Sequence, residues 1–320
     1  MVADGALRVV YFGTPEFAVP TLEALIESRH AVVALVSQPD RPRGRGQQVA
    51  HTPTRRVADA HGIPVLQPTR LKDEVFLEAL RPYAPDIGVV AAYGRILPDA
   101  LLELPRLGMV NVHASILPAY RGAAPIHRAV MAGDEETGVT IMRVVSELDA
   151  GAMLDVARVP IGADETSPDV ERRLAALGAE RLLAVLDQLA EGRAVETAQD
   201  HQAATYAPKI AREEGRVDWS RPARELHNRV RGLQPWPLVS TLIAGHRCLL
   251  HATRPEPSAA VPGDATPGTV LSADGTGMLV ATGDGALRIL ALQPEGKRVM
   301  SAREFLAGRR VEPGALATPA

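Results

Sequence analysis

Two polar side chains, Asn111 and His113, end a segment that is otherwise apolar, GMVNVH at positions 108–113. This composition predicts a buried strand, and residues i and i+2 of a strand project from the same face. We therefore expect both side chains at the carboxyl end of a parallel strand, where open α/β sheets bind their ligands. Because an amide can donate to an oxyanion and an imidazole can move a proton, the pair favours acyl transfer. A turn-capping asparagine and a structural histidine would explain the same pattern.

A carboxylate follows the next predicted strand, at Asp149 within the sequence SELDAG. Close to the imidazole, it would orient the ring and set its charge state. Taken alone, an aspartate shortly before a glycine is more typical of an ordinary turn. Asp149 therefore joins Asn111 and His113 as a candidate third member of the site.

A basic segment at positions 41–56, RPRGRGQQVAHTPTRR, contains five arginines and no acidic residue. Arg41, Arg43 and Arg45 are separated by residues that include two glycines, so this part can follow a phosphate backbone and become ordered on binding. The alternative is a solvated surface loop, since the whole chain prefers arginine to lysine.

The strands and helices that would position these residues alternate along the first part of the chain. β-Branched and apolar runs predict strands at 7–12, 31–37, 86–91, 108–113 and 138–145. Apolar residues at helical spacing predict helices around 53–61, 72–81 and 124–132, and a long helix at 166–191. Strands that are apolar on both faces and separated by helices indicate an α/β fold with a doubly wound, mostly parallel sheet.

The pattern changes after position 190. Residues 191–206 are polar and lack periodicity, which is typical of a linker. From position 237 short β-rich runs are broken by glycine and proline, which predicts a small β-barrel. We expect a catalytic domain at 1–190, a linker at 191–208 and a C-terminal barrel domain at 209–320.

Composition excludes several classes of protein. With 46% hydrophobic and 23% charged residues among 320, the chain can fold into a globular core. The single cysteine, Cys248, excludes an internal disulfide and fits a cytoplasmic protein, and the nine histidines show no metal-binding spacing. No apolar run is long enough for a membrane span, and we expect no signal peptide. The glycine fingerprint of dinucleotide sites and the P-loop are both missing.

One stretch carries a resemblance to a known family. Positions 111–118, NVHASILP, with RGAAP at 121–125, are similar to the signature of formyltransferases that use 10-formyltetrahydrofolate. Further matches are QPDRP at 38–42, ETGVTIM at 136–142, DWS at 218–220 and PWP at 235–237. Because these matches extend into the C-terminal part and include the basic segment, the chain resembles the methionyl-tRNA formyltransferases.

The resemblance implies a formyltransferase fold with an OB-like C-terminal barrel. It implies transfer of a formyl group from 10-formyltetrahydrofolate to the α-amino group of methionyl initiator tRNA, by a cytoplasmic monomer without a metal or an obligate protein partner. Asn111, His113 and Asp149 would be the catalytic residues. The residues implied to bind the folate are Ser115, Ile116, Leu117 and Pro118, and those implied to bind tRNA are Arg41, Arg43 and Arg45. Ala114 and Ala150 depart from the family pattern beside the catalytic residues.

Other functions remain open at this point. A formyltransferase for a small amine, such as a nucleotide sugar or glycinamide ribonucleotide, would share the three catalytic residues but would need neither the basic segment nor the barrel. Hydrolysis of the formyl donor to formate is a second alternative. A non-catalytic RNA-binding protein on the same fold is a third, and the intact catalytic set argues against it.

Overall fold

The computed structural model describes residues 5–43, 48–258, 261–262 and 265–320. The chain forms two compact units. The first unit comprises residues Met1–Pro125, Glu136–Pro160 and Glu171–Ala207. The second comprises Ile126–Glu135, Ile161–Val170 and Pro208–Ala320. Two short segments that precede residue 171 thus belong to the second unit.

A seven-stranded sheet forms the centre of the first unit, in the order β10-β9-β7-β6-β1-β2-β5. Its strands are β1 (Arg8–Gly13), β2 (Ala31–Val36), β5 (Val65–Leu66), β6 (Ile87–Ala91), β7 (Met109–His113), β9 (Glu136–Arg143) and β10 (Met153–Pro160). The first five of these strands in the sequence are parallel, whereas β9 and β10 are antiparallel to their neighbours. The predicted α/β fold with a mostly parallel sheet is confirmed.

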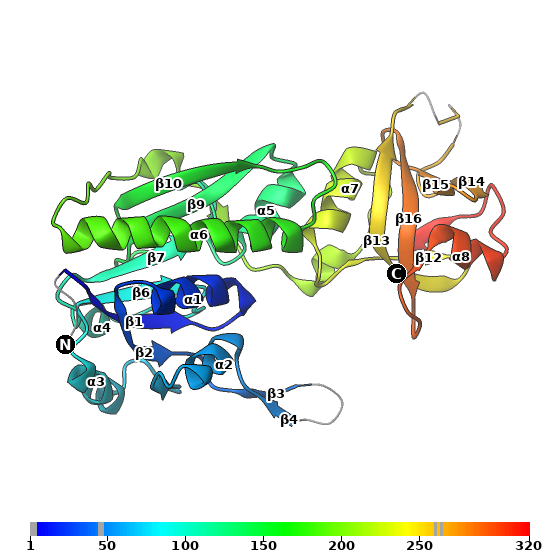
Figure 1. Ribbon diagram of the computed structural model, residues 1–320. Helices are drawn as coiled ribbons and strands as arrows, with labels where there is room; N and C mark the ends of the chain where they lie inside the picture. Colours follow the sequence, from blue (N-terminus) through cyan, green and yellow to red (C-terminus); the bar gives the residue numbers. More distant parts are fainter. Residues whose placement is uncertain (1–4, 44–47, 259–260, 263–264) are drawn as a thin grey trace. The chain divides into compact units, whose positions relative to one another are not determined.

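Helices cover both faces of this sheet (Figure 1). On one face, Val10 and Phe12 of β1 pack with Phe76 and Leu80 of α3. On the other, α6 lies close to β7, because a Cβ atom on Gly178 would lie 2.6 Å from the Val112 side chain. The helices and 3₁₀ turns of the first unit are η1 (Glu16–Ala18), α1 (Val19–Glu27), α2 (Pro53–Ala60), α3 (Glu74–Leu80), η2 (Arg81–Tyr83), α4 (Asp99–Leu102), most of α6 (Ser167–Ala190) and η3 (His201–Ala203). The second unit includes α5 (Pro125–Ala132) from its second residue onward and the first turn of α6.

Two small strand pairs lie outside the main sheet. β3 (Arg41–Arg43) and β4 (Gln48–Ala50) pair as an antiparallel hairpin that extends away from the sheet of the first unit (Figure 1). β8 (Arg121–Gly122) pairs in parallel with β11 (Tyr206–Ala207), although about 85 residues separate the two strands in the sequence. The second pair brings the end of the predicted linker back to the first unit.

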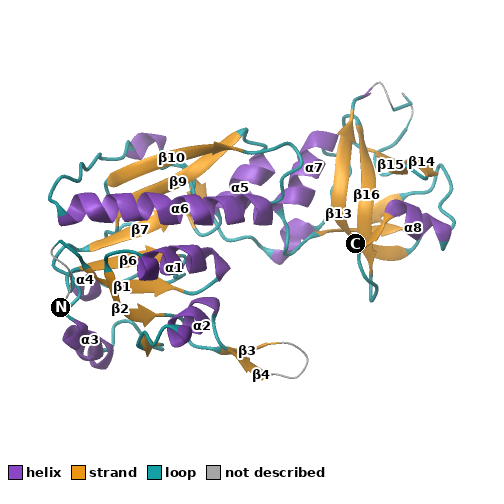
Figure 2. Ribbon diagram, in the orientation of Figure 1, coloured by secondary structure: helices purple, strands orange, loops and turns teal. Residues whose placement is uncertain are grey.

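The second unit contains the antiparallel sheet that the glycine- and proline-broken runs predicted (Figure 2). Its strands are β12 (Val239–Ile243), β13 (His246–Glu256), β14 (Val270–Asp274), β15 (Gly277–Ala281), β16 (Ala286–Pro294), β17 (Met300–Ser301) and β18 (Ala317–Pro319). A bridge between Thr269 and Leu316 joins the β14 end of the sheet to the β18 end, so the sheet closes on itself. This closure agrees with the predicted OB-like barrel.

The barrel encloses its own hydrophobic core, to which α7 (Ala223–Gly232) and α8 (Ala302–Ala307) contribute residues. The 3₁₀ turn η4 (Arg212–Gly215) precedes α7 in the sequence. Trp219 is buried in this core, whereas Trp236 is 54% exposed. Burial raises the pKa of the Cys248 thiol to about 11, which keeps it protonated and unreactive at neutral pH. Among the helices of the described residues, none is both long and apolar enough to cross a membrane.

Candidate active site

Strand β7 places Asn111 and His113 on one face of the sheet, two residues apart. β7 is hydrogen-bonded to β6 on one side and β9 on the other, so its backbone is held from both edges. His113 is buried with 5% of its surface exposed, whereas Asn111 is half-buried. None of the described residues forms a hydrogen bond with the Asn111 side chain, so its amide can donate to a ligand.

Both ring nitrogens of His113 face oxygen atoms. Nε2 lies 3.0 Å from the carbonyl oxygen of Tyr120, and because a carbonyl only accepts, Nε2 carries the proton in this contact. Nδ1 lies 3.7 Å from Oδ2 of Asp149. This second distance is too long for a hydrogen bond but short enough for electrostatic attraction when the ring holds a second proton.

Asp149 reaches the ring by an indirect route. β9 runs antiparallel to β7, so Arg143 at the end of β9 pairs with Val110 and the chain must return toward His113. The turn that makes this return holds Asp149 in the left-handed region, with a φ of 49°. Its carboxylate accepts a hydrogen bond of 2.8 Å from the backbone N–H of Gly122, which fixes Oδ2.

Gly122 is required at its position by its backbone. Its φ of 118° is one that residues with a side chain rarely adopt, and a Cβ atom there would lie 2.9 Å from the carbonyl oxygen of Ala207. The pairing of β11 with β8 therefore requires a glycine at this position. The same glycine donates the backbone N–H that binds the Asp149 carboxylate. The contact between the Tyr120 carbonyl and His113 involves a backbone atom, so no residue type in the sequence indicates it.

The segment 115–118 follows β7 directly and is tied to β9. The Thr140 hydroxyl donates to the carbonyl oxygen of Ser115 and accepts from the N–H of Leu117, at 2.7 and 3.1 Å. Ser115 and Leu117 are buried, and the Ser115 hydroxyl donates to the Ala119 carbonyl. Ile116 and Pro118 are half-buried, so they offer the side-chain surface that a ligand of this segment could contact.

The arginines of the basic segment belong to a different element from the catalytic candidates. Arg41 is exposed at the start of β3, and Arg43 ends that strand. Arg45 lies outside the described residues. The structure therefore places the sequence-predicted residues that it describes in two groups: Asn111, His113 and Asp149 around β7, and Arg41 and Arg43 on strand β3 of the hairpin.

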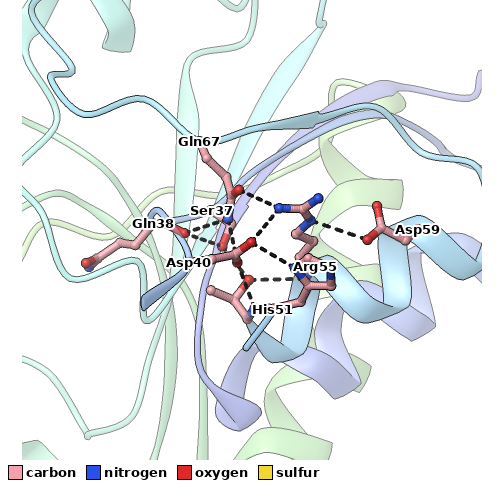
Figure 3. A network of polar contacts seen from close by, with 8 residues as sticks. Ser37, Gln38, Asp40, His51, Arg55, Asp59 and Gln67 are labelled. Carbon is pink, nitrogen blue, oxygen red and sulfur yellow. Dashed lines mark hydrogen bonds and ion pairs between the residues drawn. The ribbon is translucent and has the colours of Figure 1, made fainter. Parts of the chain in front are cut away.

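A network of polar contacts centred on Asp40 holds the base of this hairpin (Figure 3). Asp40 precedes β3, and its carboxylate accepts from the backbone N–H of Thr52, the His51 ring and the Gln67 amide, at 3.1, 2.8 and 3.0 Å. Arg55 of α2 adds a 2.5 Å ion pair. The network joins the residues before and after the hairpin to α2 and to the end of β5.

The same contacts decide the charge of Asp40. Burial by itself would raise the pKa of this carboxyl group, but hydrogen bonds from Gln67, His51 and Thr52 and the positive charge of Arg55 outweigh it. The pKa is lowered to about 2, so the carboxylate is ionised at all ordinary pH values.

Two family models match the chain, and together they cover most of it. The formyl transferase model matches residues 7–186, and the model of the formyl transferase C-terminal domain matches residues 209–310. The methionyl-tRNA formyltransferase of Citrifermentans bemidjiense is 47% identical over 97% of this chain and 96% of its own. That of Methylococcus capsulatus is 48% identical over 95% of this chain and 99% of its own.

The chain belongs to the methionyl-tRNA formyltransferase family. It is therefore a one-carbon transferase, as the resemblance of its motifs implied. Among solved structures, the sugar 3N-formyltransferase WlaRD superposes with a TM-score of 0.65 at 15% identity, over 91% of this chain and 99% of that one. This likeness confirms the formyltransferase fold. Within the described residues of this formyltransferase, no group of three or more His, Cys, Asp or Glu could hold a metal ion.

The Asp40 network predicts a change in stability when its charge is removed. Asp40→Asn should lower the free energy of unfolding by roughly 1–2 kcal/mol at neutral pH, because the folded state favours the ionised carboxylate. Because the pKa of Asp40 is lowered in the folded state, its ionised carboxylate stabilises the fold at pH values above the pKa of the unfolded chain. This stabilisation is lost as the pH falls toward 2. The difference between wild type and variant, measured by denaturant unfolding, should therefore shrink by about half from pH 6 to pH 3. A constant difference would contradict this role.

Proposed function

We propose that this protein transfers the formyl group of 10-formyltetrahydrofolate to the α-amino group of methionyl initiator tRNA, the reaction that prepares this tRNA for translation initiation. The observation that carries the proposal is a sequence identity of 47–48% with two methionyl-tRNA formyltransferases over nearly their whole length. The arrangement of Asn111, His113 and Asp149 supports it, since these residues suit acyl transfer to an amine.

Asn111 stabilises the charge that develops during the transfer. As the amine attacks the formyl carbon, negative charge accumulates on the formyl oxygen. The Asn111 amide has donors that no described residue occupies, and it stands at the carboxyl end of β7. A donor aimed at this oxygen is worth more in a half-buried position than in water.

His113 moves the proton. The attacking amine must lose a proton and the leaving nitrogen of the folate must gain one, and an imidazole can do both in turn. The Asp149 carboxylate, 3.7 Å from Nδ1, stabilises the ring while it holds the extra proton. The Tyr120 carbonyl fixes the plane of the ring through Nε2.

The formyl donor lies against residues 115–118, where Ile116 and Pro118 provide half-buried apolar surface. WlaRD, which has the same fold, was crystallised in the presence of 5-N-formyl-THF, and this supports a folate donor. Ser115 and Leu117 act by holding the segment to itself and to Thr140. No metal ion takes part.

The β3–β4 hairpin binds the tRNA through Arg41, Arg43 and Arg45. Arginines attract the phosphate backbone at long range, and the Asp40 network fixes the base of the hairpin. The barrel provides the second tRNA contact. A tRNA substrate also places the activity in the cytoplasm, where we expect the protein to act as a monomer without an obligate protein partner.

Competition between acceptors tests the proposed substrate. The enzyme is given a labelled formyl donor together with methionyl initiator tRNA, free methionine, glycinamide ribonucleotide and an amino-sugar nucleotide. Label should appear on the tRNA and not on the small amines. Label on a sugar nucleotide or on glycinamide ribonucleotide would replace this proposal with the small-amine alternative, and release of formate without an acceptor would indicate a hydrolase.

Removing the Asn111 amide should slow catalysis without weakening tRNA binding. Loss of one oxyanion donor costs about 10²–10³-fold in rate, so Asn111→Ala should lower kcat by that factor. Asn111→Asp should be at least as slow, because a carboxylate repels the developing charge. The dissociation constant of the tRNA, measured by filter binding, should change little. Near-normal turnover of the alanine variant would remove Asn111 from the mechanism.

The hairpin arginines should act on binding instead. Replacing Arg41, Arg43 and Arg45 with alanine should weaken tRNA binding and flatten the slope of log K against log salt by up to about 0.9 for each lost phosphate contact. The matched control replaces Arg29, Arg81 and Arg106, three exposed arginines that lie before β2, at the start of the η2 turn and before β7. An equal change in salt slope for both triple variants would show a general charge effect and contradict a hairpin contact.

A further inference from the structure

Gln199 is a buried glutamine in the segment that the sequence presents as a linker, and it is 5% exposed. Its amide nitrogen donates to two carbonyl oxygens, those of Asp149 and Gly151, each at 2.8 Å. Its amide oxygen accepts from Nε and Nη2 of Arg121, at 3.1 and 2.8 Å. Each polar atom of the amide therefore has the partners that its chemistry allows.

The neighbours leave the amide one orientation. An arginine only donates, so the oxygen of Gln199 must face Arg121, and the two carbonyls only accept, so the nitrogen must face them. No other amino acid of this size offers both a double acceptor and a double donor. A glutamate would place a carboxylate oxygen against two carbonyl oxygens, and an apolar residue would leave all three partners unsatisfied.

Arg121 explains why this contact is strong. Its side chain is 1% exposed, and its only described carboxylate partner is Glu147, at 3.5 Å and largely exposed. A buried guanidinium needs acceptors, and Gln199 supplies two of the hydrogen bonds. The charge of Arg121 also strengthens the bonds that the opposite end of the amide makes to the Asp149 turn.

Residues 120–122 link this contact to the catalytic ring. The Tyr120 carbonyl lies against His113, and the Gly122 N–H binds the Asp149 carboxylate. Strand β8 and the preceding Tyr120 are fixed by β11 and by Thr205. The Thr205 carbonyl accepts from the backbone N–H of Arg121, and its hydroxyl accepts from the backbone N–H of Tyr120. Residues 199–207 therefore contact both the Asp149 turn and residues 120–122.

We infer that Gln199 is a positioning residue of the active site, which together with Arg121 holds the turn so that the Asp149 carboxylate lies against His113. The inference rests on the proposed catalytic role of Asp149. It gives the segment between α6 and the second unit a part in catalysis, which its polar and aperiodic sequence does not indicate.

The decisive variant is Gln199→Glu, which keeps the size of the side chain and an acceptor for Arg121 but removes both donors. Displacement of a catalytic group by about 1 Å can cost about 10²-fold, so we expect kcat for methionyl-tRNA to fall by about 10- to 100-fold. The KM values for tRNA and for the folate donor should stay within about twofold of wild type. The matched control is Gln202→Glu, the same change at an exposed position of the same segment.

A double-mutant cycle shows whether Gln199 acts through Asp149. In an Asp149→Asn background, Gln199→Glu should add no more than about a twofold further loss in kcat, because the carboxylate it positions is already gone. Equal fold-losses in both backgrounds, or near-normal activity of Gln199→Glu alone, would overturn the inference. Gln199→Met, which also lacks the donors, should follow the same pattern if the glutamate variant fails to fold.

A second readout is independent of the substrate. Nitrogen NMR of the histidine rings, without ligands, should show the His113 signals shifted by Asp149→Asn and shifted in the same sense by Gln199→Glu. Unchanged His113 signals in Gln199→Glu would overturn the positioning role. If wild type does not formylate methionyl-tRNA, the proposed function fails, whereas the NMR comparison still decides the role of Gln199.

Discussion

A carboxylate carried on a turn can act on a neighbouring ring only if the turn is held as firmly as the ring. His113 meets this condition easily, because β7 has a hydrogen-bonded strand on each side. Asp149 does not, because it lies in a left-handed turn after an antiparallel strand that ends beside Val110. Gly122 and Gln199, with Arg121 behind them, supply the hydrogen bonds that hold this turn in place.

The two proposed functions of the first unit, catalysis and tRNA binding, use the same kind of construction. In each, a loop that must present charged groups is fixed at its base by a polar side chain with several hydrogen-bond partners. Gln199 has this role for the Asp149 turn and Asp40 has it for the β3–β4 hairpin. Backbone atoms supply many of these partners. Substitution of the charged groups therefore tests their role in catalysis or binding. Substitution of Gln199 or Asp40 tests how far that role depends on the position of the loop.

The sequence predicts those features that depend on local periodicity. Buried strands follow from short apolar runs, and the shared face of Asn111 and His113 follows from the two-residue period of a strand. Asp149 follows from its place after the next predicted strand and from the family resemblance. The sequence does not predict the direction of β9, because an apolar strand has the same residue pattern whether it pairs in parallel or antiparallel with its neighbour. Nor does it reveal Gln199 or the pairing of β8 with β11, which join residues about 80 positions apart. The prediction of a linker there is based only on its polar, aperiodic composition.

Both tryptophans of the chain, Trp219 and Trp236, belong to the second unit, one in its core and one largely open to solvent. The first unit therefore contributes no indole emission, whereas its helices contribute to the far-ultraviolet circular dichroism. Following both signals during denaturation distinguishes melting of the barrel from melting of the catalytic unit without any added label. Coincident transitions would indicate that the two units unfold together.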